Sequence, residues 1–157
     1  MGRRYTVTTS AVAVSAAQDL LEYLVPADKI LRLHECHVTQ SSDAGDSESE
    51  QFRVSIRRVT GSPTSGSGGS TPTPRPNDGG DAAAGGTIEA NNTTQLSGGT
   101  NVVLHEESAN VMSGLHYMPT PEAKFDFAGQ TRLLIELEAA PADSLTMSIT
   151  TVVEEIG

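Results

Sequence analysis

Three residues whose side chains bind transition metals lie within four positions of one another, namely His34, Cys36 and His37. Imidazole nitrogen and thiolate sulfur are the ligands that zinc prefers in proteins. The surrounding run predicts a β-strand, in which His34 and Cys36 point to one face and His37 to the other, so the three cannot converge without a bulge. The two other histidines, His105 and His116, are isolated in the sequence. We therefore expect ordinary packing and hydrogen bonding at these residues, and no metal.

A second group with ligand chemistry is acidic and consists of Asp43, Asp46, Glu48 and Glu50. Carboxylate oxygens bind calcium, but the spacing of these acids differs from the helix–loop–helix calcium signature. That signature also requires a glycine at the sixth position of the loop, and the glycine here, Gly45, does not occupy it. An acidic, solvated loop between two strands explains the run more simply. Calcium binding to this loop stays open as the alternative.

No arrangement of nucleophile and base is apparent. Ser97 and Ser113 are each followed by glycine but lack the flanking spacing of a nucleophile elbow. Adjacent acids such as Glu154 and Glu155 point to opposite faces of a strand, so they cannot act together on one substrate. With three tyrosines, three phenylalanines and no tryptophan, the chain has few rings on which a sugar could stack. We predict a non-enzymatic chain without catalytic residues or cofactor, with a carbohydrate-binding β-sandwich as the alternative.

The charge of the chain bounds its partners. Its net charge is −10, and its basic residues cluster only as the pairs Arg3-Arg4 and Arg57-Arg58. Nucleic acid and anionic membranes repel such a protein unless a basic face is present, so neither is expected as a partner. A single cysteine excludes an intrachain disulfide, and no apolar run reaches the length of a membrane span.

The elements that position these residues are predicted to be strands, because apolar residues alternate with polar ones and no segment has a convincing helical period. The predicted strands are 5–14 with a bend near Ser10, 20–25, 30–40, 52–57, 87–90, 101–105, 111–118, 124–127, 132–138 and 145–153. Strands 30–40 and 52–57 are expected to pair as antiparallel neighbours across the acidic loop. The pattern predicts an all-β fold, an antiparallel β-sandwich forming one domain over residues 1–157.

Residues 61–86 interrupt this pattern, because they contain eight of the fifteen glycines and four of the eight prolines. The segment has almost no large apolar side chain to bury, which predicts an extended arm that a partner surface holds in place. Prolines at alternate positions favour a stiff, polyproline-like path that reaches roughly 80 Å when fully extended. The alternative is a surface insertion that lies along its own subunit. The candidate partner-contact residues are Pro63, Pro72, Pro74, Arg75 and Pro76.

Residues 68–76 and 80–94, together with residues 41–46 and the ending 154–157, resemble a family of small proteins encoded by tailed bacteriophages. The resemblance implies a virion component, namely a head decoration (cement) protein or minor capsid protein, with a jelly-roll-like sandwich. It implies as partners the major capsid protein or other virion proteins, and a homo-oligomer, with a trimer expected first.

The resemblance also implies a location. The protein would be made in the host cytoplasm and would lie on the outer surface of the phage head. The acidity of the chain agrees with this side of the shell, because the phosphates of the packaged DNA would repel the protein from the lumen. Placement in the tail or neck of the virion fits the same residues and stays open.

Overall fold

The computed structural model describes residues 2–42 and 50–157, which form strands and one 3₁₀ turn without any α-helix. In this described part, no helix is long and apolar enough to cross a membrane. The elements are β1 (Arg3–Val14), β2 (Gln18–Leu24), β3 (Ile30–Gln40), β4 (Gln51–Thr60), β5 (Arg75–Pro76), β6 (Thr87–Asn92), β7 (Thr100–Asn110), β8 (Leu115–Tyr117), η1 (Pro121–Ala123), β9 (Phe125–Phe127), β10 (Arg132–Leu137) and β11 (Leu145–Ile156).

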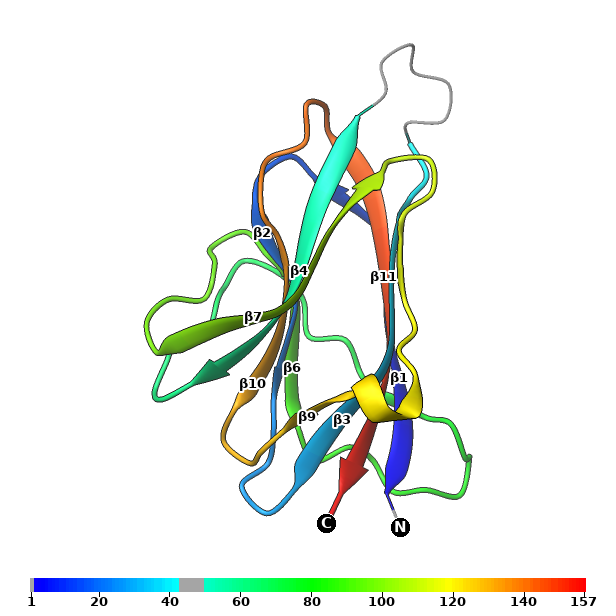
Figure 1. Ribbon diagram of the computed structural model, residues 1–157, viewed down its shortest axis with the longest axis vertical. Coiled ribbons are helices and arrows are strands. Elements are labelled where there is room, and N and C mark those ends of the chain that lie inside the picture. Colours follow the sequence, from blue (N-terminus) through cyan, green and yellow to red (C-terminus); the bar gives the residue numbers. More distant parts are fainter. Residues whose placement is uncertain (1, 43–49) are drawn as a thin grey trace.

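The strands form two antiparallel sheets that face each other, as Figure 1 shows. Sheet A has the order β5-β1-β11-β3-β8, with β9 also paired to β3, and sheet B has the order β6-β2-β10-β4-β7. The pairing runs in reverse order along the chain, because β1 pairs with β11, β2 with β10, β3 with β8 and β4 with β7. The predicted all-β, sandwich-like fold of antiparallel strands is confirmed.

One expected pairing is wrong. Strands β3 and β4 lie in different sheets, so they do not form the antiparallel hairpin that the sequence predicted. Strand β4 pairs instead with β10 and β7, and β3 pairs with β11, β8 and β9. A connection of ten residues between these strands is long enough to carry the chain from one sheet to the other, so their order in the sequence did not make them neighbours.

The core between the sheets consists of alternate residues of the facing strands. Strand β11 follows this pattern over its whole length, with every second residue buried. Buried aromatic and aliphatic side chains from both sheets form one continuous cluster. Cys36 belongs to this cluster and is fully buried, and its burial raises the pKa of the thiol to about 12. The space between the sheets is therefore filled by apolar packing.

Two irregularities in sheet A set the direction of nearby side chains. The register between β1 and β11 shifts between Thr9 and Val12, and Ala11 has a φ of 55°, which confirms the predicted bend near Ser10. Strand β3 also contains a bulge, because Glu35 pairs with Val152 and Leu33 with Val153, so that His34 is an extra residue. The two faces of β3 therefore exchange at His34, which the period-two prediction did not anticipate.

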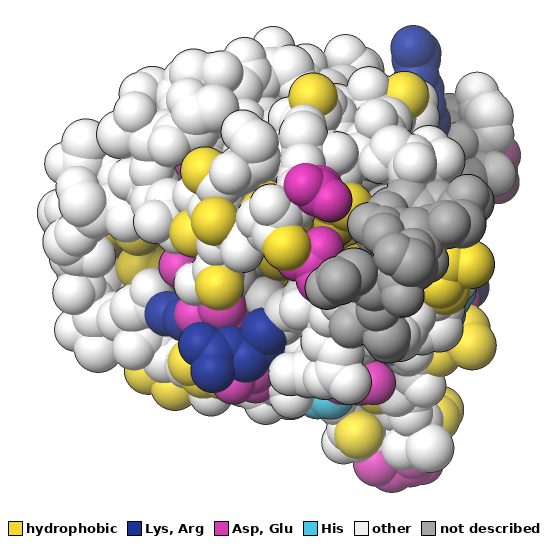
Figure 2. All heavy atoms as spheres, turned by 90° about the horizontal axis from the view of Figure 1, so that it is seen from above, with side chains coloured by type: hydrophobic (Ala, Val, Ile, Leu, Met, Phe, Trp, Pro, Cys, Tyr) yellow, Lys and Arg dark blue, Asp and Glu magenta, His cyan; other side chains and the backbone are white. Residues whose placement is uncertain are grey.

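The surface is mostly polar, and its large apolar side chains are dispersed. Seen from above, apolar groups appear as separate patches, and the Lys and Arg groups at the lower left lie beside Asp and Glu groups, whereas one at the upper right stands apart (Figure 2). The exposed large apolar residues are Ile30, Val102, Val103, Met112 and Met118. Val102 and Val103 are adjacent residues of β7, an edge strand of sheet B.

Candidate functional site

Residues 61–86 do not project from the body; they lie along their own chain. The first part of the 61–86 segment runs beside residues 90–97, to which it is joined by the isolated bridges Thr64–Ser97, Ser67–Thr94 and Ser70–Ala90. Backbone hydrogen bonds of 2.8–3.1 Å make up these bridges. The observed path is thus the insertion along its own subunit that the sequence left as the alternative to a free arm.

A buried carboxylate on sheet B fastens this first part. Glu22 of β2 is 3% exposed, and it accepts hydrogen bonds from the Ser65 hydroxyl at 3.0 Å and the Gly66 amide at 3.2 Å. The Arg132 guanidinium lies 2.8 Å from the same carboxylate and also donates to the Pro63 carbonyl at 3.0 Å. The pair of Glu22 and Arg132 therefore joins two strands of sheet B to the segment that covers them.

The middle of the 61–86 segment joins sheet A. Its residues Arg75 and Pro76 form β5, which pairs with Thr6 and Tyr5 of β1. The Asn77 amide continues the pairing by donating to the Arg4 carbonyl at 2.9 Å. The segment thus runs from sheet B to the outer edge of sheet A, and it covers the backbone of residues 4–6 of β1, which would otherwise be open sheet edge.

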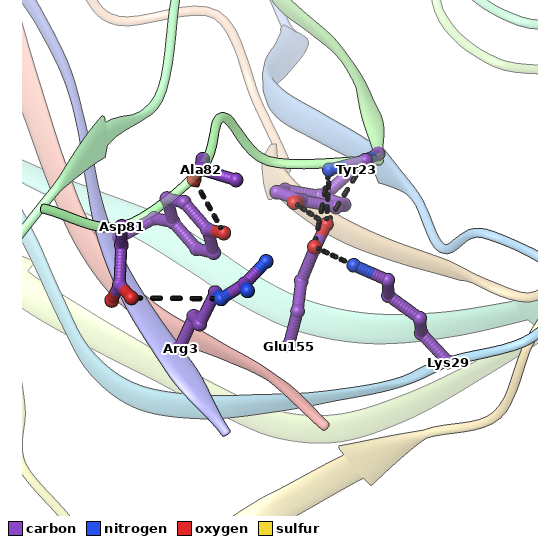
Figure 3. Close-up of polar contacts among 9 residues, drawn as sticks. Arg3, Tyr23, Lys29, Asp81, Ala82 and Glu155 are labelled. Atoms are coloured by element: carbon purple, nitrogen blue, oxygen red, sulfur yellow. Dashed lines mark hydrogen bonds and ion pairs between the residues drawn. The ribbon is translucent and has the colours of Figure 1, made fainter. Parts of the chain in front are cut away.

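The end of the 61–86 segment is held by Glu155, a buried residue of β11 (Figure 3). Its carboxylate accepts hydrogen bonds from the Tyr23 hydroxyl at 2.7 Å, from Lys29 Nζ at 2.8 Å, and from the Gly85 and Gly86 amides at 2.9–3.1 Å. Burial raises the pKa of Glu155, but the hydrogen bonds from Lys29, Tyr23 and the two amides outweigh it and hold the pKa below its ordinary value.

This carboxylate also affects its neighbours. Burial and the hydrogen bond to Glu155 raise the pKa of Tyr23, which therefore stays a neutral donor. Gly86 lies so close to Tyr23 that a Cβ atom on it would be 2.0 Å from the ring. Nearby, the Tyr5 hydroxyl donates to the Ala82 carbonyl at 3.0 Å (Figure 3). The four-donor carboxylate and the tight glycine together fix the end of the segment.

The predicted contact residues lie at different depths along this path. Pro63, Pro72, Pro74 and Pro76 are half-buried, whereas Arg75 is exposed. The exposed residues that alternate with the last three prolines are Thr71, Thr73 and Arg75. The prolines therefore face the body of the protein, as a stiff extended path requires, and a partner would meet chiefly the residues between them. That these residues contact a partner stays a prediction.

An open groove lies between the 61–86 segment and the start of β1. Its volume is about 720 Å³, and its lining residues are Gly2, Arg3, Arg4, Asn77, Asp78, Asp81 and Glu154. Arg3 makes an ion pair with Asp81 at 3.5 Å, which Figure 3 shows. Within the described residues, Arg4 and Arg75 have no ion-pair partner. The groove lining therefore carries two arginines and three carboxylates, and Arg75 lies exposed on the adjacent edge.

The residues with metal-ligand chemistry are placed apart. The bulge in β3 turns His34 outward, where it contacts Glu154 and Lys124 at 2.8 Å each, while Cys36 enters the core. His37 lies on the outer face against His116. In residues 2–42 and 50–157 no group of three or more His, Cys, Asp or Glu side chains converges in a way that could hold a metal ion.

The structure places the acidic residues singled out in the sequence in different surroundings. Asp43, Asp46 and Glu48 lie outside the described residues, whereas the Glu50 carboxylate accepts a hydrogen bond from the Ala142 amide. Glu154 and Glu155 point to opposite faces of β11, as the strand period predicted, since Glu154 contacts His34 on the outside and Glu155 contacts Tyr23 inside.

Sequence reasoning missed the residues that fasten the segment. Glu22 could have been recognised from the sequence, because it is a single acid within the apolar run 20–25, where an unpaired charge is unfavourable. Glu155 and Arg132 could not, because they stand at the ends of strands where charged residues are common.

Comparison of the chain with protein-family models, with curated proteins and with solved structures found no match in any of the three.

Proposed function

We propose that this chain is a structural virion protein of a tailed bacteriophage, and that it binds the outside of the head as a decoration protein. The observation that carries the proposal is the reverse-order pairing of the strands. Strands β1, β11, β3 and β8 make up most of one sheet, and β2, β10, β4 and β7 most of the other. Eight strands paired in this reversed order support a jelly roll, the architecture of many viral capsid domains.

The surface of the protein supports the same role. Sheet-edge backbone is a template for uncontrolled association, and here the 61–86 segment covers the start of β1 while it stays attached to its own subunit. A stably folded, acidic body with a covered edge suits a protein that must remain soluble until it meets its shell. The net charge of −10 favours the outside of a DNA-filled shell over its interior.

The surface that we assign to the shell is the edge formed by β1 and β5. Arg75 lies opposite Thr6 in the pairing of these strands, and Arg4 is two residues from Thr6, so both arginines point to the outer face of sheet A. An acidic patch on the major capsid protein would complement them. The half-buried prolines hold the Arg75 backbone in place, so little conformational entropy is lost when the edge docks.

The decisive experiment is localisation of the protein in intact particles of the phage that encodes it, by electron microscopy at a resolution that shows the fold. Density for the two-sheet body on the outside of the head is expected. Density in the tail or neck would move the proposal to that part of the virion, and absence of the protein from purified particles would contradict a structural role altogether.

A matched pair of charge reversals tests the docking edge. Arg4→Glu with Arg75→Glu should reduce binding to particles that lack the protein by at least about tenfold, since two cations facing an acidic patch become anions. The control is Arg53→Glu, because Arg53 is an exposed arginine of β4 in sheet B, away from the β1–β5 edge, and its carboxylate neighbour is Glu106 of the same sheet at 3.6 Å. Equal loss in both variants would show that the effect is not specific to this edge.

A second candidate function is carbohydrate binding, since jelly rolls also occur in lectins. A pocket of about 280 Å³ supports it, and Gln18 lines this pocket with a buried amide nitrogen that has no hydrogen-bond partner among the described residues. The other lining residues are Val12, Ala13, Gly68, Gly69, Ser70, Asn91 and Thr93. Screening of the protein on a glycan array, with Gln18→Leu as the comparison, tests this function.

A further inference from the structure

His37 and His116 lie opposite each other on β3 and β8, and both point to the outer face of sheet A. Their Nδ1 atoms are 2.9 Å apart. Each outer nitrogen faces an acceptor that cannot donate: His37 Nε2 lies 3.4 Å from the Glu35 carboxylate, and His116 Nε2 lies 3.0 Å from the Ser113 carbonyl. Because a neutral imidazole carries one proton, these acceptors favour the tautomer with that proton on Nε2 in both rings.

The consequence concerns the two facing nitrogens. With both protons on Nε2, both Nδ1 atoms carry lone pairs, and two lone pairs at this distance repel each other unless a cation lies between or beside them. A histidine that binds a metal through one nitrogen almost always donates from the other to a carboxylate or a backbone carbonyl. His37 and His116 have one acceptor of each kind.

The other two histidines lack this arrangement. His34 contacts an acceptor, Glu154, through Nε2 and a donor, Lys124, through Nδ1, so neither of its nitrogens has a free lone pair. His105 faces Glu107 at 3.3 Å through Nε2 and packs its ring against Tyr117, with no second histidine beside it. The pair of His37 and His116 is therefore distinct among the four histidines of the chain.

We propose that His37 and His116 form a two-histidine binding site for a divalent transition-metal ion, with Nδ1 of each ring as ligand. Two nitrogens bound about 2.0–2.1 Å from one ion at a right angle are about 2.9 Å apart, which is the geometry of neighbouring positions in a square-planar or tetragonal complex. Cu²⁺ and Ni²⁺ prefer this geometry. The rings lie at the surface, so small rotations direct both lone pairs at one ion, and the remaining positions face solvent.

The site goes beyond the proposed virion role and does not depend on it. Glu35 and the Ser113 carbonyl act as positioning groups, because they hold the tautomer that leaves Nδ1 free. The positions that the protein does not fill are open to water or to a donor side chain of another molecule docked on this face. An ion bound here would therefore also add a fixed positive charge to the outer face of sheet A.

The test uses the full chain and Cu²⁺ alone. Titration by calorimetry and electron paramagnetic resonance of the copper complex should show one ion per chain with two histidine nitrogens. His37→Gln and His116→Gln should each weaken binding by about tenfold or more, and the double variant should be little weaker than either, since one imidazole alone is not a chelate. Glu35→Gln should give a smaller loss that keeps the two-nitrogen signal.

His105→Gln is the matched control, because it removes a partly exposed histidine that also faces a carboxylate. It should leave the affinity and the spectrum unchanged. Copper binding that persists unchanged in His116→Gln would overturn the proposal, as would a wild-type protein that binds no more tightly than the His37→Gln/His116→Gln double variant. In the latter case, a proton shared by the two Nδ1 atoms would relieve the repulsion between their lone pairs.

Discussion

The outer faces of the two sheets are built from the same kind of alternating strand, yet one is covered and the other is open. On sheet B, Val59 and Leu134 are buried although they lie outside the core cluster between the sheets, and Glu22 beside them is buried too. On sheet A, the corresponding outward residues include Thr8 and His37, which stay partly or fully accessible. The chain itself therefore determines which face another molecule can reach.

The difference follows from the path of the 61–86 segment. Its first part and residues 93–97 lie over sheet B, and its later part passes along the edge of sheet A without covering the face. On the covered face the pair of Arg132 and Glu22 is buried, whereas on the open face the pair of Arg32 and Asp126 is exposed. The comparison teaches that stability should depend on the covered contacts, and recognition on the open face and its β1–β5 edge.

The largest expected effect tests two neighbouring acids on opposite sides of β11. Glu155→Ala removes the acceptor of Lys29 and of two backbone amides, and leaving such buried donors unpaired should lower the free energy of unfolding by about 3–5 kcal/mol. Glu154→Ala, on the outer face, removes one hydrogen-bond acceptor, that of His34, and should cost less, about 1–2 kcal/mol. Urea unfolding measures both. Similar losses for the two variants would contradict the comparison.

The next effect compares two arginine–carboxylate pairs of nearly equal length. The covered pair of Arg132 and Glu22 is 2.8 Å long, and the exposed pair of Arg32 and Asp126 is 2.7 Å long. Glu22→Gln should destabilise the protein by roughly 3 kcal/mol, because the Arg132 charge stays buried without its partner. Asp126→Asn should leave the urea midpoint unchanged within error, since water solvates Arg32. A shift of the midpoint in Asp126→Asn would show that exposure does not decide these contributions.

A third effect is pH-dependent and concerns Asp19 on the covered face. Its carboxylate is buried and accepts one hydrogen bond from the Leu96 amide at 2.6 Å, and burial raises its pKa from 3.8 to about 6. The folded state therefore holds the proton more tightly than the unfolded state. Stability is highest below about pH 4 as far as this group is concerned, and it falls by about 2 kcal/mol as pH rises to about 6.

Asp19→Asn should remove this fall, because an amide accepts from Leu96 without becoming charged. Urea midpoints measured at several values between pH 4 and pH 7 should decline in the wild type and decline less in the variant. Glu155 contributes with the opposite sign, since its lowered pKa favours the charged form, so the difference between variant and wild type is the quantity to compare. Parallel pH profiles would refute the assignment to Asp19.

The smallest effect separates the fastened and open parts of the 61–86 segment with one type of substitution. A Cβ on Gly86 would overlap the Tyr23 ring, so Gly86→Ala should cost about 1–3 kcal/mol. No atom lies within 4 Å of a Cβ built on Gly79, so Gly79→Ala should be neutral or slightly stabilising, through lower entropy of the unfolded chain. Thermal melting of the two variants distinguishes a clamped segment from a loose one.

Sequence reasoning succeeded where one strand decides the outcome. The bend near Ser10, the all-β class and the opposite directions of Glu154 and Glu155 all follow from local alternation. It failed for the partners of β3 and β4, because pairing between strands depends on contacts distant in sequence. The glycine-rich composition of residues 61–86 likewise indicated freedom, whereas carboxylates more than 30 positions away fix the segment.

The reverse-order pairing also constrains when the protein can fold as it leaves the ribosome. Strand β1 is the first to be synthesised and β11 the last, yet each is the other's neighbour in sheet A. The clamp on residues 85–86 likewise waits for Glu155. Until β11 emerges, β1 has no partner along most of its length, and the nascent chain must avoid other strands. Such distant pairing predicts slow folding, after translation instead of during it.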